Sequence, residues 1–148
     1  MRVALQRVRR AAVTVDGERV ASIGPGYLLL VGIGSQDAAD EVERMAEKIA
    51  NLRLFPDDEG KTNLALAEVD GEILVVSQFT LYADVRKGRR PSWTTAAAPE
   101  VASERVEAFA RSLEERGFVV RRGVFGAHMD VELLNDGPFT LVLDADRI

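Results

Sequence analysis

The chain has 148 residues, 47% of them hydrophobic, which is enough for one domain, residues 1–148, with a single core. It contains no cysteine and one histidine, which excludes disulfides, thiolate nucleophiles, and zinc sites built from cysteines or several histidines. The net charge of −5 argues against broad nucleic-acid binding, so any RNA contact must be local. Because no stretch resembles a signal peptide or a membrane span, we expect a cytoplasmic protein without a membrane partner.

The first third of the chain predicts a meander of β-strands. Apolar residues dominate four segments, 3–8, 12–15, 20–23 and 27–33, with turns between them. Residues 37–52 predict an amphipathic helix, with Asp37 available as its N-cap. The glycine-containing turns that precede this helix lack the spacing of a phosphate loop, so we expect no nucleotide cofactor. With no cysteine and a single histidine in the chain, we also expect no metal.

The middle of the chain predicts a hairpin, a buried strand and a second helix. Residues 69–72 form a tight turn that leads into the apolar strand 73–76. The helix begins with Pro99 at its first position and stops at Gly117. From residue 118 onward, strands and turns alternate, which together with the two helices predicts an α+β fold.

Small polar groups follow two of the predicted strands. Strand 73–76 is followed by Ser77, Gln78, Phe79 and Thr80. Strand 131–134 runs into a Gly-Pro turn, after which residues 139–143 leave as another strand. Each segment alone fits an ordinary strand end or hairpin turn. Together, they predict a functional site where the two strand ends meet.

Five motifs, in this order, resemble the D-aminoacyl-tRNA deacylase family. They are the opening strands, SQFTL at 77–81, RKG and RPS at 86–92, F-x-A-x-M at 125–129, and NDGP-x-T at 135–140. The resemblance spans essentially the whole chain. It implies a strongly curved, mostly antiparallel, barrel-like sheet with two helices, a two-fold homodimer, and hydrolysis of the ester of D-aminoacyl-tRNA.

The resemblance also assigns the site residues. The catalytic site would contain Gln78, Phe79 and Thr80, whose N–H groups would stabilise an oxyanion, while Ser77 would support the strand end. Gly137 and Pro138 would form a cis peptide that enters the partner subunit's pocket, where it rejects L-aminoacyl groups and leaves D-aminoacyl and glycyl groups. Two further residues, Phe125 and Met129, would form an apolar floor, although both also fit an ordinary core.

The chemistry expected of this site needs no protein base. A serine or threonine nucleophile is usually activated by a histidine, and His128 is the only histidine in the chain. We interpret His128 as a strand or turn residue rather than as an activator. An aminoacyl-tRNA carries a ribose hydroxyl next to its ester, so the substrate can supply the catalytic group. Whether the Thr80 hydroxyl takes part stays open, as does the alternative of a threonine- or serine-nucleophile esterase.

A cationic segment follows the first strand end. Arg86, Lys87, Arg89 and Arg90 place four cations in five residues, with Trp93 close behind. A charge run alone is typical of a solvated loop, but its position beside the site predicts contact with the phosphates of tRNA, rather than with DNA. A noncatalytic RNA-binding module that uses this loop is the second alternative.

Overall fold

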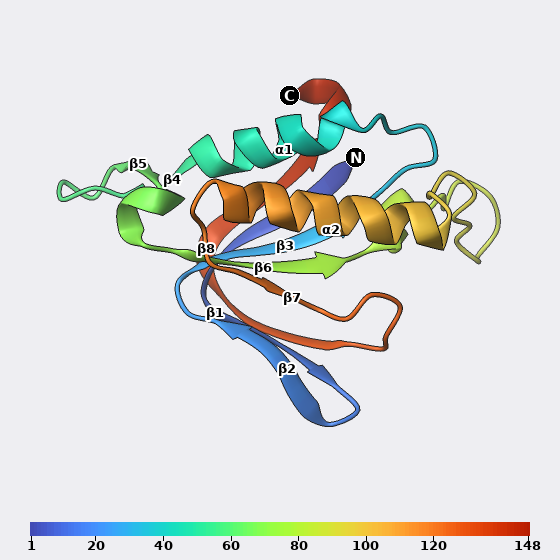
Figure 1. Cartoon of the computed structure of the whole chain (residues 1–148), viewed down its shortest axis with the longest axis horizontal. Helices are drawn as coiled ribbons and strands as arrows, with labels where there is room; N and C mark the ends of the chain where they lie inside the picture. Colours follow the sequence, from blue (N-terminus) through green and yellow to red (C-terminus); the bar gives the residue numbers. More distant parts are fainter.

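The structure, a computed structural model that describes residues 1–148, is built around a curved six-stranded sheet with two helices (Figure 1). The sheet runs in the order β2-β1-β3-β6-β7, and β8 pairs with the other edge of β1. Its strands are β1 (Arg2–Val15), β2 (Glu18–Ile23), β3 (Gly26–Gly32), β6 (Glu72–Ser77), β7 (Val120–Arg122) and β8 (Asp130–Asp144). Two short strands, β4 (Arg53–Pro56) and β5 (Thr62–Ala65), form a separate hairpin.

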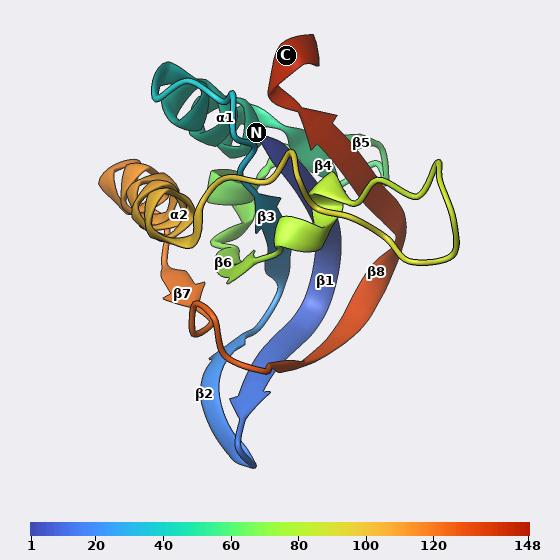
Figure 2. The same ribbon diagram turned by 90° about the vertical axis from the view of Figure 1, so that its right-hand side faces the viewer.

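Strand β1 sets the curvature of the sheet. Its first half, residues 2–8, pairs antiparallel with β3, and residues 11–15 pair antiparallel with β2. Register irregularities bend β1 against both β2 and β8, and the resulting curve is visible in Figure 2. The pairs β3·β6 and β6·β7 are parallel, whereas the other pairings are antiparallel. The prediction of a curved, mostly antiparallel α+β fold is therefore confirmed.

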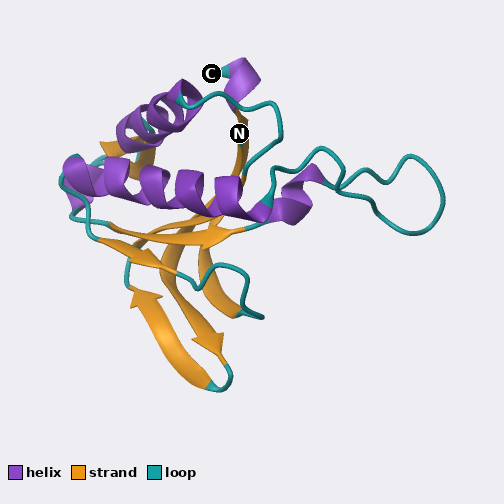
Figure 3. Ribbon diagram, turned by 45° about the vertical axis from the view of Figure 1, so that its right-hand side comes forward, coloured by secondary structure: helices purple, strands orange, loops and turns teal.

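Both helices cover the same face of the sheet (Figure 3). Helix α1 (Asp40–Asn51) buries the predicted stripe of Val42, Met45, Ala46 and Ile49. Helix α2 (Pro99–Glu115) begins at the predicted proline, and Gly117 follows it with a φ of +91°, which suits glycine. No helix is both long and apolar enough to cross a membrane.

The prediction that Asp37 caps α1 is wrong. The helix begins three residues later, because the Asp37 carboxylate accepts hydrogen bonds from the Gly34 N–H at 2.5 Å and the Tyr82 hydroxyl at 3.0 Å. Burial raises the pKa of Asp37, but hydrogen bonds from the terminal amine, Gly34 and Tyr82 outweigh it and leave the pKa below its usual value.

Two predicted hairpin turns are also wrong. A turn does occur at Asp70 within the predicted range 69–72, after a 3-10 helix of residues 66–69, but it is not a hairpin, because β6 pairs in parallel with β3 and β7 while β5 pairs with β4. The Gly-Pro segment lies within one continuous strand, β8, which pairs with β1 on both sides of it. Between the pairs Gln6–Thr140 and Val8–Asn135 the register shifts, so residues 136–139 bulge out of the ladder.

Candidate active site

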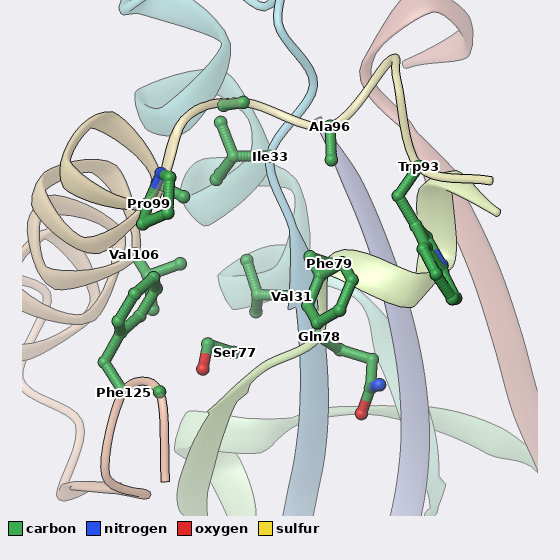
Figure 4. Close-up of a pocket in the computed structure, with 13 residues that line it drawn as sticks. Val31, Ile33, Ser77, Gln78, Phe79, Trp93, Ala96, Pro99, Val106 and Phe125 are labelled. Atoms are coloured by element: carbon green, nitrogen blue, oxygen red, sulfur yellow. The ribbon is translucent and has the colours of Figure 1, made fainter.

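The end of β6 opens onto an apolar cavity of about 410 Å³ beside the start of α2 (Figure 4). Ser77, Gln78 and Phe79 line it from the strand end, and Phe125 lines it from the loop after β7. In Figure 4, the rings of Phe79 and Phe125 stand on opposite sides of the cavity. The structure therefore brings the SQFTL segment and one residue of the F-x-A-x-M motif together.

The residues after β6 turn at once into a 3-10 helix, Phe79–Tyr82. The Gln78 N–H donates to the Val31 carbonyl at 2.7 Å, which continues the pairing with β3 for one more residue. The first bond of the helix runs from the Leu81 N–H to the Gln78 carbonyl at 3.2 Å. The N–H groups of Phe79 and Thr80 precede that bond, so the helix does not use them.

Close packing fixes the position of this short helix. A Cβ at Gly32 would lie 2.9 Å from the Gln78 carbonyl oxygen and 3.1 Å from the Leu81 Cβ.

The Gln78 side-chain amide donates to the Thr80 hydroxyl, and no carboxylate or histidine hydrogen-bonds to that hydroxyl. Thr80 therefore has no partner that could act as its general base.

Gly137 and Pro138 lie away from the cavity of their own chain. Strands β3 and β1 separate β6 from β8 in the sheet, so the two strand ends do not meet within one chain, contrary to our prediction. Neither residue lines the cavity, both are exposed, and the peptide bond between them is cis. Their role across a dimer interface stays a prediction.

Arg7 holds the segment that carries Gly137 and Pro138. The Arg7 Nε donates to the Asp136 carbonyl at 3.2 Å and lies 3.0 Å from an Asp136 carboxylate oxygen. Its guanidinium lies 4.0 Å from the centre of the Phe139 ring, and the side chain is only 7% exposed. The Asn135 amide donates to the Arg7 carbonyl at 2.9 Å. Sequence reasoning missed Arg7, although an arginine within an apolar strand was a signal.

Met129 does not form a floor of the cavity. Its side chain packs against the apolar cluster that includes Leu74 and Val76, whereas Ile73 and Val75 belong to the larger core beneath the helices. Alternate residues of β6 point to opposite faces of the sheet, so Met129 lies on the face away from the helices. Phe125 and Met129 are thus separated by the sheet, and only Phe125 reaches the cavity.

The predicted cationic segment is a closed loop, residues 84–92, which we call the basic loop. Two backbone hydrogen bonds between Asp84 and Ser92, of 2.8 and 3.0 Å, close its base. Arg86 forms a bidentate pair with Asp84, and its hydrogen bonds lower the pKa of Asp84 to about 2. Lys87, Arg89 and Arg90 are exposed and form no ion pair, so the loop carries three free cations rather than four.

Trp93 follows the basic loop at the rim of the cavity. Trp93 is 40% exposed and Phe79 is 57% exposed, and their rings meet edge to face with 5.5 Å between ring centres. Both rings contribute to the cavity lining. The rim is therefore an exposed aromatic pair next to a cationic loop.

Comparisons with known proteins find similar sequences over nearly the whole chain. The model of the D-Tyr-tRNA(Tyr) deacylase family matches residues 4–144. A D-aminoacyl-tRNA deacylase of Chloroflexus aurantiacus is 60% identical over the whole chain and 92% of the relative. One of Thermomicrobium roseum is 58% identical over the whole chain and 96% of the relative.

Two solved structures are similar over nearly their full lengths. The c-Myc DNA unwinding element binding protein gives a TM-score of 0.90 with 40% identity, over 97% of this chain and 98% of that one. A probable eukaryotic D-amino acid tRNA deacylase gives a TM-score of 0.80 over 96% of this chain and 97% of that one. At 20% identity, the second likeness concerns the fold alone.

Proposed function

The chain belongs to the D-aminoacyl-tRNA deacylase family, and we propose that its apolar cavity receives the aminoacylated 3′ end of a tRNA. As an enzyme of this family, it hydrolyses the ester of D-aminoacyl-tRNA and releases a D-amino acid and free tRNA. The observation that carries the proposal is that residues from two family motifs, Phe79 and Phe125, stand on opposite sides of one cavity. Aromatic rings that line a cavity offer a planar nucleobase surfaces on which to stack.

The unused N–H groups of Phe79 and Thr80 are the donors that we assign to the developing oxyanion. A preorganised donor of this kind contributes about 10²–10³-fold to the rate. Because Thr80 has no base beside it, we assign the activation of the attacking water to the neighbouring hydroxyl of the terminal ribose. Water adds to the carbonyl, and the ester oxygen leaves with a proton as the ribose hydroxyl of free tRNA.

Chiral selection is assigned to Gly137 and Pro138 of the partner subunit in a two-fold homodimer. Three observations support this: both residues are exposed, Arg7 holds the segment around them, and β1 and β3 separate them from the cavity of their own chain. An isologous interface would place the pair at each cavity of the dimer. An L-aminoacyl side chain would collide with it, whereas D-aminoacyl and glycyl groups would not.

The basic loop is assigned to the tRNA backbone. Its three free cations, Lys87, Arg89 and Arg90, lie on the segment that joins the SQFTL motif to the cavity rim. Phosphate contacts position an RNA without reading its sequence, which suits an enzyme that acts on a 3′ end shared by all tRNAs. The local charge also explains how a chain of net charge −5 binds RNA.

Deacylation of matched D- and L-aminoacyl-tRNA tests this function, with glycyl-tRNA as a third substrate. We expect cleavage of the D and glycyl substrates and survival of the L substrate. Comparable cleavage of both enantiomers would contradict the assigned chiral selection. Tight tRNA binding without any deacylation would favour the RNA-binding module instead.

A terminal 2′-deoxy substrate and Thr80→Ala test the substrate-assisted mechanism. We expect the deoxy substrate to resist cleavage and Thr80→Ala to retain turnover. Thr62→Ala, in the separate β4·β5 hairpin, is the matched control. Normal cleavage of the deoxy substrate, together with an inactive Thr80→Ala variant, would favour an esterase with a protein nucleophile.

A further inference from the structure

Trp93 forms an exposed aromatic pair with Phe79, and the ester chemistry gives the Trp93 ring no role. The two residues are 40% and 57% exposed and their rings meet edge to face, so a large part of their surface contacts water. Exposed aromatic rings beside cations are the usual platform on which single-stranded nucleic acids stack their bases. The pair therefore points to a base outside the cavity.

The backbone presents the Trp93 ring from a fixed position. On one side, the hydrogen bonds between Ser92 and Asp84 close the basic loop immediately before Trp93. On the other side, the Ala96 N–H donates to the Trp93 carbonyl at 3.0 Å, and Ala96 itself bridges to Gly34 beyond β3. A ring held on a constrained backbone loses little entropy when it binds a base.

The size of the cavity shows where a second nucleotide must go. At about 410 Å³, the cavity lies near the lower end of the range of roughly 300–1,000 Å³ typical of small-ligand sites. A cavity of this size suits one nucleoside with its acyl group, so we place a second nucleotide outside it. The RNA strand must therefore leave over the rim, where Trp93 lies between the cavity and the free cations of the basic loop.

We propose that Trp93 stacks on the base of the nucleotide that precedes the terminal adenosine, while the free cations of the basic loop hold the phosphates on its 5′ side. This proposal rests on the proposed function, because it requires the RNA 3′ end to occupy the cavity. It makes Trp93 a positioning residue that lowers KM for tRNA without touching the ester. An aminoacylated adenosine, which lacks the preceding nucleotide, gains nothing from it.

A thermodynamic cycle tests the stacking. The probes are the unacylated trinucleotide cytidine-cytidine-adenosine and the same trinucleotide with an abasic middle position, titrated against wild type, Trp93→Ala and Trp93→Phe. Loss of one stacked base costs about 5- to 150-fold in affinity. We expect the affinity to fall by this factor when Trp93→Ala binds the normal probe, and likewise when the wild type binds the abasic probe. When Trp93→Ala binds the abasic probe, the affinity should fall no further than in either single case. Trp93→Phe should retain most of the affinity.

Trp93 also reports on the contact directly, because it is the only tryptophan in the chain. The normal trinucleotide should quench its fluorescence more strongly than adenosine or the abasic probe, both of which lack the preceding base. The proposal would be overturned if Trp93→Ala lowered the affinity for the normal and the abasic trinucleotide by the same factor. It would also be overturned if Trp93→Ala left the affinity for the normal trinucleotide unchanged. If D-aminoacyl-tRNA is cleaved but the affinity losses from Trp93→Ala and from the abasic position add up, only the stacking is wrong. If the combined loss is no larger than either single loss but no D-aminoacyl-tRNA is cleaved, the deacylase function is refuted and the stacking stands.

Discussion

Removing the Arg7 side chain should destabilise the fold far more than removing its exposed neighbour Arg9. Both arginines pair with Asp136: Arg7 Nε at 3.0 Å and Arg9 Nε at 3.4 Å from its two carboxylate oxygens. Arg7 is 6% exposed, whereas the Arg9 side chain is 71% exposed. The two variants therefore compare a buried and a solvent-screened contact with the same carboxylate.

The magnitude follows from what Arg7→Ala leaves behind. The guanidinium also donates to the Leu54 carbonyl and covers the Phe139 ring, so its loss leaves the Leu54 carbonyl without this donor and Asp136 with only the exposed Arg9 as an ion-pair partner. Breaking a buried charge pair in this way costs about 3–5 kcal/mol. Arg9→Ala removes a surface ion pair, for which about 0–1 kcal/mol is typical.

Urea unfolding of the wild type and both variants measures this difference. With a slope of about 2 kcal/mol/M, Arg7→Ala should lower the midpoint by roughly 2 M, and Arg9→Ala by less than about 0.5 M. Arg7→Lys keeps the charge but loses the planar stacking on Phe139, and we expect an intermediate midpoint. Similar midpoints for Arg7→Ala and Arg9→Ala would refute the assignment of Arg7 as the residue that holds the Gly-Pro segment.

Three further predictions concern Tyr27, Asp37 and the free cations of the basic loop. The buried Tyr27 hydroxyl has no hydrogen-bond partner, so Tyr27→Phe should leave the free energy of unfolding unchanged or raise it by about 1 kcal/mol; a loss above that, measured in urea, would mean that the hydroxyl has a partner. Because the pKa of Asp37 lies below its usual 3.8, its carboxylate stabilises the fold above that pH and loses this effect as the pH falls through the folded pKa. Asp37→Asn should therefore lower the melting temperature at pH 7, and by progressively less as the pH falls below 3.8; a drop that grows as the pH falls would contradict this sign. Neutralising the three free cations of the basic loop should reduce the slope of log affinity for tRNA against log salt by about three, whereas an unchanged slope would make it an ordinary solvated loop.

Local patterns in the sequence predicted the elements that local physics decides. The apolar spacing of α1, and Pro99 and Gly117 at the ends of α2, depend on residues within a few turns of one helix. The apolar strand before Ser77 was predicted for the same reason. The family motifs then located Phe79 and Phe125, which the structure brings to one cavity.

Pairing between distant segments was not predictable from local patterns. The Gly-Pro segment has the composition of a turn, but the ladder with β1 continues on both sides of it and absorbs it as a bulge. Arg7 resembles an ordinary strand residue until β8 places Asp136 beside it. Met129 lies away from the cavity because the sheet separates it from Phe125, and a spacing of four residues does not reveal which face each one occupies.

The pairing of β1 with β8 has a consequence for how the chain folds during synthesis. These strands contact along almost their whole lengths, yet more than 100 residues separate their partners, such as Val13 and Val131. Such non-local contacts slow folding, because a long loop must close before they form. While the ribosome is still making the second half of the chain, one edge of β1 lacks its partner and can pair with another chain. Arg9 and Arg10, exposed charges on β1, are the kind of residues that discourage such pairing until β8 emerges.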